Sequence, residues 1–223
     1  MCGRFALSKS DRIDWAQSGV RRGPALPPHW NLGPGRPIAV VRDTAAGADV
    51  AMLSWGLVPF WAKERSIGNR LTNARAESAH EKPAFRAAFQ KRRCLIPADG
   101  FYEWQVVSGT ARKQPWFVQR ADGGVFALAG LWERWQPAEG EPVETCTVLT
   151  TAANALMAPI HDRMPVIIDV AAYTEWLSPL SSGDRARALL QPWAASAMTA
   201  HRVSLRVNVQ AHDDAECVAP EAL

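Results

Sequence analysis

The chain has 223 residues, of which 48% are hydrophobic and 21% are charged, and its formal net charge is +3. This composition is typical of a globular protein with one sizeable core, and so small a net charge gives no general argument for nucleic-acid binding. No apolar run reaches the roughly 18 residues of a membrane span, and the amino terminus lacks a secretory pattern. We therefore expect a cytoplasmic protein with no membrane partner and one domain over residues 1–223.

The early part of the chain is expected to contain strands, short helices and loops. Ser10 can cap a short helix that ends near Gly19. The proline- and glycine-rich segment 21–37 is expected to be an ordered loop or a crossing segment rather than a regular element. Strands are expected at residues 37–43 and 50–58, joined as a hairpin, and helices are expected at 73–79 and 83–92.

In the later part of the chain, expected strands outnumber expected helices. The segment 115–120 is expected to pair with 125–135 across a turn at residues 121–124. Because the strands are joined mainly by short turns, the sequence predicts an α+β fold with a largely antiparallel, barrel-like β-sheet and peripheral helices. Further strands are expected at 93–98, 101–107, 145–151, 164–169 and 202–209, and helices at 171–177 and 184–190.

The cysteines and the short motifs exclude several kinds of site. Cys2, Cys94, Cys146 and Cys217 are far apart, without the paired spacing of a structural zinc site or a disulfide framework. Cys94 and Cys146 lie in apolar runs and are expected in the core. Phosphate-binding loops, nucleophile elbows, zinc-protease helices and dinucleotide fingerprints are absent from the sequence. We therefore expect neither a metal ion nor an organic cofactor.

Cys2 is a candidate nucleophile because a small second residue favours removal of Met1. The mature chain then begins at Cys2, with an amine and a thiol whose ordinary pKa values are about 8 and about 8.5. An aldehyde condenses with the amine to an imine, and the thiol closes a five-membered thiazolidine ring, whereas an internal cysteine gives only a reversible hemithioacetal. The alternative is that Cys2 is simply a small buried residue near the end of the chain.

Two residues are candidates for proton transfer. Glu103 lies in an aromatic, strand-like segment, where burial raises the pKa of a carboxyl toward neutrality. His161 lies between Pro159 and Pro165, which restrict the backbone, and the ordinary imidazole pKa of about 6.5 suits a proton shuttle. The alternatives are a glutamate at a solvent-facing strand edge and a structural histidine. Glu133 lies in similar aromatic surroundings and is a rival to Glu103.

Basic, amide and aromatic side chains accompany these segments. Asn73 offers an amide that can orient a substrate, and Arg75 offers a guanidinium for a phosphate, unless the two are a helix cap and a solvent-facing arginine. A positive groove with stacking aromatics such as Phe60 and Trp61 is typical of proteins that bind a single nucleic-acid strand. The arginines concerned are Arg4, Arg70, Arg75, Arg86 and Arg163.

Several short motifs follow one another in a fixed order: Cys2-Gly3-Arg4-Phe5, Trp55-Gly56-Leu57-Val58-Pro59-x-Trp61, Asn73-x-Arg75-x-Glu77, Arg93-Cys94-Leu95-Ile96-Pro97-Ala98-x-Gly100-Phe101-Tyr102-Glu103-Trp104, Ala129-Gly130-Leu131-Trp132 and His161-x-Arg163-Met164-Pro165. Together they resemble the SOS response-associated peptidase (SRAP) family over nearly the whole chain. The loop at Trp30-Asn31-Leu32-Gly33 departs from the Tyr-Asn-Ile-Ala-Pro-like residues usual in that family, although Asn31 and Pro34 are retained.

The resemblance implies a single SRAP domain that recognises abasic sites in single-stranded DNA and traps them as a covalent crosslink during the DNA damage response. By the same resemblance, Cys2 matches the crosslinking residue and Asn73 the amide near the sugar and the α-amine. Glu103 matches the proton-transfer residue, and His161 matches the active-site histidine. We expect a monomer that is nucleoid-associated when it acts on abasic single-stranded DNA, with replication or repair proteins as further partners.

The resemblance also implies a DNA-contacting surface. Trp61 matches the loop that separates stacked bases, and the arginines that match or accompany phosphate-contacting positions are Arg4, Arg70, Arg75, Arg86 and Arg163. Two other functions fit the same residues. In a thiol peptidase, Cys2 attacks an acyl carbon with His161 or the terminal amine as base, and it removes Met1 or a short leader autoproteolytically. In a non-covalent reader of damaged or modified DNA, the arginines and Trp61 suffice.

Overall fold

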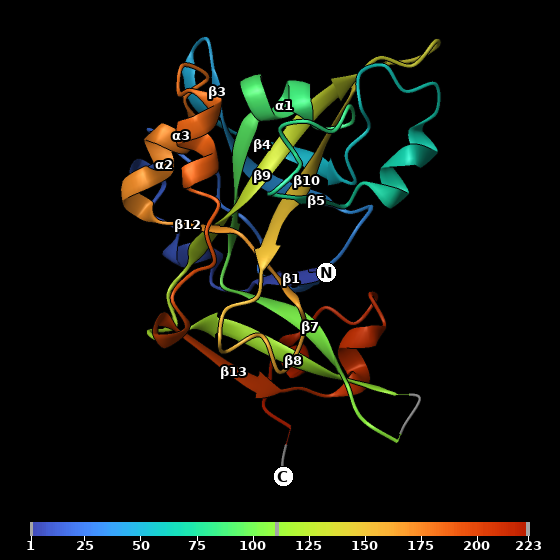
Figure 1. The fold of residues 1–223 in the computed structure, drawn as a ribbon, viewed down its shortest axis with the longest axis vertical. Coiled ribbons are helices and arrows are strands. Elements are labelled where there is room, and N and C mark those ends of the chain that lie inside the picture. Colours follow the sequence, from blue (N-terminus) through green and yellow to red (C-terminus); the bar gives the residue numbers. More distant parts are fainter. Residues whose placement is uncertain (1, 110–111, 222–223) are drawn as a thin grey trace.

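Strands form two sheets in residues 2–109 and 112–221, the part of the chain that a computed structural model describes (Figure 1). The helices are short and lie at the periphery of the sheets. The α+β class and the largely antiparallel, barrel-like arrangement expected from the sequence are therefore confirmed. Within these residues, no helix has the length and apolar character that crossing a bilayer requires.

The larger sheet closes on itself. Its strands are β3 (Pro37–Thr44), β4 (Gly47–Trp55), β5 (Asn73–Arg75), β6 (Arg93–Ala98), β9 (Phe126–Trp135), β10 (Val143–Ala152), β11 (Arg163–Pro165) and β12 (Ile167–Ile168). Their order is β11-β10-β4-β3-β6-β9-β12, and an additional pairing of β10 with β9 completes a ring of β10, β4, β3, β6 and β9. Most pairs are antiparallel, but β10 runs parallel to β4 and to β5.

The smaller sheet carries the start of the chain. Its strands are β1 (Arg4–Leu7), β2 (His29–Leu32), β7 (Gly100–Val106), β8 (Lys113–Arg120) and β13 (Met198–Arg202), in the order β13-β8-β7-β1-β2. Figure 1 shows β1 between β7 and the strands of the larger sheet. The chain passes from β6 to β7 at Asp99, whose carboxylate accepts from the Ser8 hydroxyl at 2.9 Å and the Lys9 amide at 2.5 Å. This contact ties β1 to the crossing point between the sheets.

Three short α-helices, α1 (Arg86–Lys91), α2 (Tyr173–Leu177) and α3 (Gly183–Ala188), lie outside the larger sheet. The buried Arg93 guanidinium joins two of them, because it donates to the carbonyls of Phe89 at 2.7 Å and Trp176 at 2.6 Å. The 3-10 helices are Ser10–Arg12, Trp15–Ser18, Arg65–Arg70, Val170–Ala172, Ala195–Ala197, Leu205–Asn208 and Ala215–Cys217.

Three expectations about local structure are wrong. The predicted helix at 73–79 begins instead as strand β5, because Asn73–Arg75 finds backbone partners along β10. The predicted helix near Ser10 is two 3-10 turns, the second of which is capped by Asp14 and ends at the left-handed Gly19. The proline-rich segment 21–37 contains strand β2, which pairs with β1. In the first and third cases strand pairing with a distant segment outweighs the local propensity.

Two strand predictions also differ from the structure. Strand β8 pairs with β7 and β13 rather than with β9, because the chain crosses between the sheets after β8. The predicted strand 202–209 ends at Arg202, and Leu205–Asn208 is a 3-10 helix capped by the Ser204 hydroxyl. Pairing between sheets depends on long-range packing, which the alternation of apolar residues does not reveal.

A C-terminal strap, defined as residues 203–217, holds β2 and β1 in place. The Asp213 carboxylate accepts from His29 Nδ1 at 2.7 Å, from the Trp30 and Asn31 amides at 2.6 and 2.9 Å, and from Arg36 at 2.9 Å. Burial opposes ionisation of Asp213, but these hydrogen bonds prevail and lower its pKa. The buried Asn31 amide in turn donates to the Val207, Val209 and His212 carbonyls of the strap.

Replacing Asp213 with Asn should destabilise the protein. The N–H groups of the new amide would face N–H groups that now donate to the carboxylate, in a partly buried network. We expect a loss of about 2 kcal/mol in the free energy of unfolding, measured by chemical denaturation. Glu216→Gln, at a largely exposed carboxylate of the same strap, serves as the control and should change this free energy by less than about 0.5 kcal/mol. Equal effects of the two substitutions would remove Asp213 from its role as the anchor.

Candidate functional site

Cys2 is fully buried at the start of β1, within the core between the two sheets. Its thiol donates to the Arg4 carbonyl at 3.8 Å, and its own carbonyl accepts from Asn73 Nδ2 at 2.9 Å. Burial raises the pKa of the Cys2 thiol well above its ordinary value, and the charge of Glu103 raises it further. The thiol is therefore protonated near neutral pH and needs a proton acceptor before sulfur forms a bond.

Asn73 is placed against Cys2 by the parallel pairing of β5 with β10, in which Val148 lies opposite Asn73. Its Nδ2 group is used by the Cys2 carbonyl and, more weakly, by Thr72 Oγ1 at 3.4 Å. Its Oδ1 atom is buried and accepts no hydrogen bond from the described residues. A buried acceptor without a donor is costly, so Asn73 offers a position for an N–H or O–H group next to Cys2.

Glu103 lies in β7, one strand away from Cys2, and it is buried. The alternation expected from the sequence holds, since Phe101 packs in the core that contains Cys2 while Tyr102 packs with Phe117 on the other face. Burial raises the pKa of Glu103 to about 7. The carboxyl can therefore give and take a proton near neutral pH, as a general acid and base must.

His161 faces Glu103, with its Nε2 atom 3.9 Å from Glu103 Oε2. The Arg163 amide donates to His161 Nδ1 at 3.0 Å, which leaves the proton of the neutral ring on Nε2. The protonated ring can instead donate from Nδ1 to Asp162, 2.9 Å away. Burial lowers the pKa of His161, so the neutral ring is favoured near pH 7.

Glu133, the rival carboxylate, belongs to a different environment. It is buried on β9, where it pairs with Arg92 at 2.7 Å and accepts from the Arg134 amide at 3.0 Å. Its contacts are thus an arginine and the backbone, without Cys2 or His161. The sequence places Glu103 and Glu133 in similar aromatic segments, the family resemblance favours Glu103, and the sheet topology puts the two carboxylates in different surroundings.

A surface groove of about 420 Å³ opens beside Asn73. Trp61 forms part of its wall, is 49% exposed and donates from Nε1 to the Pro83 carbonyl at 3.3 Å. Arg75 lies exposed at the end of β5 and also lines the groove. The remaining lining residues combine an apolar floor with one lysine, namely Leu71, Ser78, Lys82, Pro83, Ala84 and Phe85. This groove has the flat aromatic and cationic groups that a nucleic-acid strand requires.

The other candidate arginines lie in different surroundings. The Arg4 guanidinium donates to Asn31 Oδ1 at 2.8 Å and to the Val207 carbonyl at 2.7 Å, so it also anchors the C-terminal strap. Arg163 forms a fork with Glu77, at 2.6 and 2.8 Å. Arg70 and Arg86 are exposed, at the end of a 3-10 helix and the start of α1, and neither lines the groove beside Asn73.

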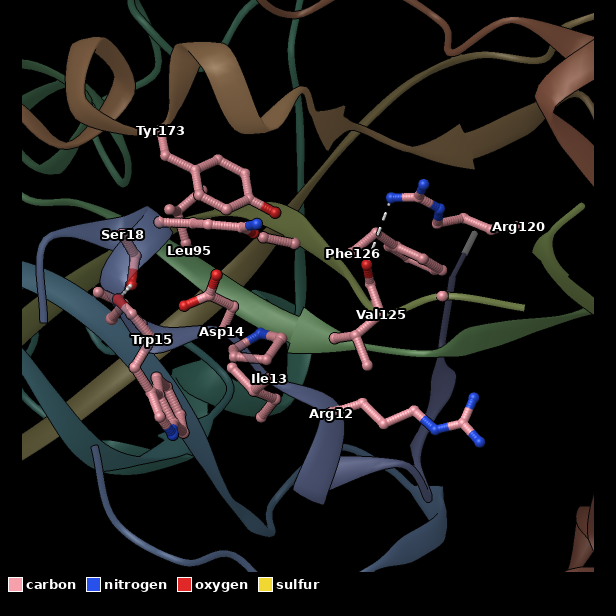
Figure 2. A pocket seen from close by; sticks show the side chains of 15 residues that line it. Arg12, Ile13, Asp14, Trp15, Ser18, Leu95, Arg120, Val125, Phe126 and Tyr173 are labelled. Atoms are coloured by element: carbon pink, nitrogen blue, oxygen red, sulfur yellow. Dashed lines mark hydrogen bonds between the residues drawn. The ribbon is translucent and has the colours of Figure 1, made fainter. Parts of the chain in front are cut away.

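A separate cavity of about 210 Å³ lies between the first 3-10 turns and the larger sheet. Figure 2 shows the Asp14 carboxylate and the Tyr173 ring on its walls, and Arg120 donating to the Val125 carbonyl at its edge. The described residues that line it include none of the candidate catalytic or DNA-contacting residues. We therefore take the surroundings of Cys2, rather than this better enclosed cavity, as the candidate site.

The structure thus brings Cys2, Asn73, Glu103 and His161 together from β1, β5, β7 and the turn before β11. Such an arrangement can bind a carbonyl compound and move protons next to a nucleophile. Sequence reasoning gave no role to Glu77, although this residue stood in a recognised motif. A negative charge so close to Arg75, a candidate phosphate contact, was a signal that Glu77 belongs to the arginine cluster. The candidate roles themselves come from the family resemblance and from this geometry.

Comparisons with known proteins agree with the fold. The abasic site processing protein YoqW of Bacillus subtilis (strain 168) is 40% identical over 225 residues, which cover 98% of this chain and 99% of YoqW. The abasic site processing protein HMCES of Rattus norvegicus is 32% identical in an alignment 201 positions long, which covers 77% of this chain and 56% of HMCES. A crystal structure of a Bacteroides thetaiotaomicron protein, 26% identical, superposes with a TM-score of 0.88 over 99% of this chain and 100% of that one.

The family comparison covers nearly the whole chain as well. The model of the family described as SOS response associated peptidase (SRAP) matches residues 1–210. This range includes each motif on which the resemblance rested, from Cys2 to Pro165. The chain belongs to the SRAP family.

Proposed function

We propose that this protein processes abasic sites in single-stranded DNA by joining the lesion covalently to Cys2. The main support is the placement of Cys2 against Asn73. In addition, the buried Glu103 carboxyl has a pKa of about 7, and its charge raises the pKa of the Cys2 thiol. The names of the relatives from Bacillus subtilis and Rattus norvegicus, both abasic site processing proteins, support DNA with abasic sites as the target. The groove lined by Trp61 and Arg75 is suited to the flanking strand.

The first chemical step is imine formation. Once Met1 is removed, the Cys2 amine adds to the C1′ aldehyde of the ring-opened deoxyribose and gives a carbinolamine. Protonated Glu103 donates to the departing hydroxyl, so one water leaves, a protonated imine forms, and Glu103 is left ionised. The open acceptor on Asn73 is available to the amine during this step. His161 protonates the sugar O4′ during ring opening and takes this proton back in the reverse reaction.

The second step closes the ring. The Cys2 thiol gives its proton to ionised Glu103, its sulfur adds to the carbon of the protonated imine, and the products are a neutral thiazolidine and a protonated Glu103. The balance is one aldehyde plus one cysteine giving one thiazolidine and one water. Because burial keeps the thiol protonated, the acceptor must lie within the pocket, and Glu103 supplies it. Its near-neutral pKa allows the carboxyl to act as the acid first and as the base afterwards.

The observations favour this chemistry over the two alternatives. A thiol peptidase needs a ready thiolate, whereas burial and the charge of Glu103 both raise the thiol pKa, and Nε2 of His161 faces Glu103. A non-covalent reader needs only the groove and its arginines, and the catalytic arrangement around Cys2 would have no use. The covalent proposal uses both features.

Mixing the protein with an oligonucleotide that carries one abasic site should give a band that survives denaturing electrophoresis. The intact mass should equal the chain without Met1 plus the oligonucleotide minus one water. Cys2→Ser keeps the amine but lacks the thiol, so any adduct should remain an imine. Borohydride should trap this imine as a stable bond, and heating without borohydride should release the DNA. A stable wild-type band that persists after complete acetylation of the α-amine would contradict the mechanism, and the lack of any band would favour the non-covalent reader.

Replacing Glu103 with Gln should slow crosslinking by about 10²-fold, because the variant loses an acid and a base while it keeps the shape of the side chain. The wild-type rate should decline above pH 7, where Glu103 ionises, and this decline should be missing from the variant. Glu133→Gln removes another buried carboxyl, on a strand of the larger sheet, and is the matched control, with an unchanged rate expected. Rates would be measured with excess protein on denaturing gels, and an equal slowing by both variants would exclude Glu103 from proton transfer.

Glu103 should also make stability depend on pH. Its folded pKa of about 7 exceeds the ordinary value of 4.5, so its contribution to stability is present at low pH and is lost as the pH rises through 7. Relative to wild type, Glu103→Gln should therefore gain about 2 kcal/mol of unfolding free energy between pH 5 and pH 8. Chemical denaturation at both pH values measures this gain, with Glu139→Gln as an exposed control. A difference that stays constant with pH would mean that Glu103 has an ordinary pKa in the folded protein.

A further inference from the structure

Glu77 occupies the hydrogen-bonding edge of Arg163. Its two carboxylate oxygens accept from the two terminal nitrogens of Arg163 at 2.6 and 2.8 Å. The same guanidinium donates to the Thr150 carbonyl at 2.5 Å, which fixes Arg163 against β10. The arginine proposed to contact DNA is therefore already paired with a negative charge that belongs to the protein.

The position held by the Glu77 carboxylate is suited to a phosphate. Two oxygens of a phosphodiester match the fork of a guanidinium as well as a carboxylate does. The hydrogen bonds from Arg163 lower the pKa of Glu77 first, and the charges of Arg163 and Arg75 lower it further. Glu77 thus lies in the field of two arginines to which we assign phosphate contacts.

The two members of this ion pair differ in their access to solvent. The Arg163 side chain is 12% exposed, whereas that of Glu77 is 54% exposed. The guanidinium is anchored from within by Thr150, while the carboxylate covers it from the solvent side. A phosphate that approaches from solvent meets Glu77 first, and the glutamate can turn outward while Arg163 stays in place.

We propose that Glu77 is a built-in competitor, a carboxylate that occupies the phosphate position on Arg163 until a DNA strand displaces it. This inference rests on the proposed function, because it requires the strand to pass Arg163. A strand must break the hydrogen bonds between Glu77 and Arg163 before it binds, and this free-energy cost reduces the affinity of the protein for any single strand, damaged or not. The carboxylate therefore limits retention on undamaged DNA, while a lesion is held by its bond to Cys2.

The test compares wild type with Glu77→Gln in binding an undamaged oligothymidine, followed by fluorescence anisotropy over a range of salt concentrations. Glutamine removes the charge, so binding at low salt should tighten about threefold or more. The plot of log affinity against log salt should steepen by up to about 0.7, because Arg163 then exchanges a counterion for the phosphate. Glu81→Gln removes an equally negative, largely exposed carboxylate that is paired with His80, and it is the matched control.

The outcomes separate the two proposals. Weaker or unchanged binding by Glu77→Gln, or an equal gain with Glu81→Gln, would overturn the role of Glu77 and leave the crosslinking proposal standing. Failure of wild type to bind the oligothymidine or to crosslink abasic DNA would overturn the proposed function, and this inference with it.

A second measurement needs no variant. The Glu77 carboxyl of wild type, followed by carbon NMR, should move from its lowered pKa toward an ordinary one when the strand binds. A pKa that stays low in the complex would show that Arg163 keeps Glu77 as its partner.

Discussion

The structure depends on the burial of an ionisable carboxyl, Glu103, next to a buried thiol, Cys2. Water is removed from both groups, so the charged form of each is disfavoured and both pKa values rise. The thiol gains protection from solvent but loses its ready nucleophilicity, and the carboxyl gains a near-neutral pKa that lets it take the thiol proton. The buried thiol thus needs the carboxyl as its proton acceptor, and the carboxyl can serve because its pKa is near neutral.

Much of the fold serves to hold β1, a strand of the smaller sheet that begins two residues after this thiol, against the larger sheet. Asp99 fixes the far end of β1 through Ser8 and Lys9, and Asn73, in a strand of the other sheet, donates to the Cys2 carbonyl just before β1. Arg4 links β1 to the C-terminal strap, which Asp213 attaches to β2. Residues that are distant in the sequence thereby determine where a terminal residue, which would otherwise fray, places its amine and its thiol.

The sequence predicted the fold class and most of the strands because alternation and turn residues are local signals. It did not predict that β8 pairs with β7, or that Asn73 starts a strand, since both depend on partners far along the chain. The chemistry of Cys2 followed from its position, and the raised pKa of Glu103 from its aromatic neighbours. The family resemblance already selected Glu103 rather than Glu133, and the structure places the two carboxyls in different surroundings. The covering of Arg163 by Glu77 became visible only in the structure.

The most direct test of the central claim is a carbon NMR titration of the Glu103 carboxyl in the protein that begins at Cys2. Selective labelling of glutamate and comparison with Glu103→Gln would assign its resonance. The account predicts a midpoint of about 7, set mainly by burial. A midpoint near the ordinary value of 4.5 would mean that the carboxyl is solvated, and it would contradict the role of Glu103 as both acid and base.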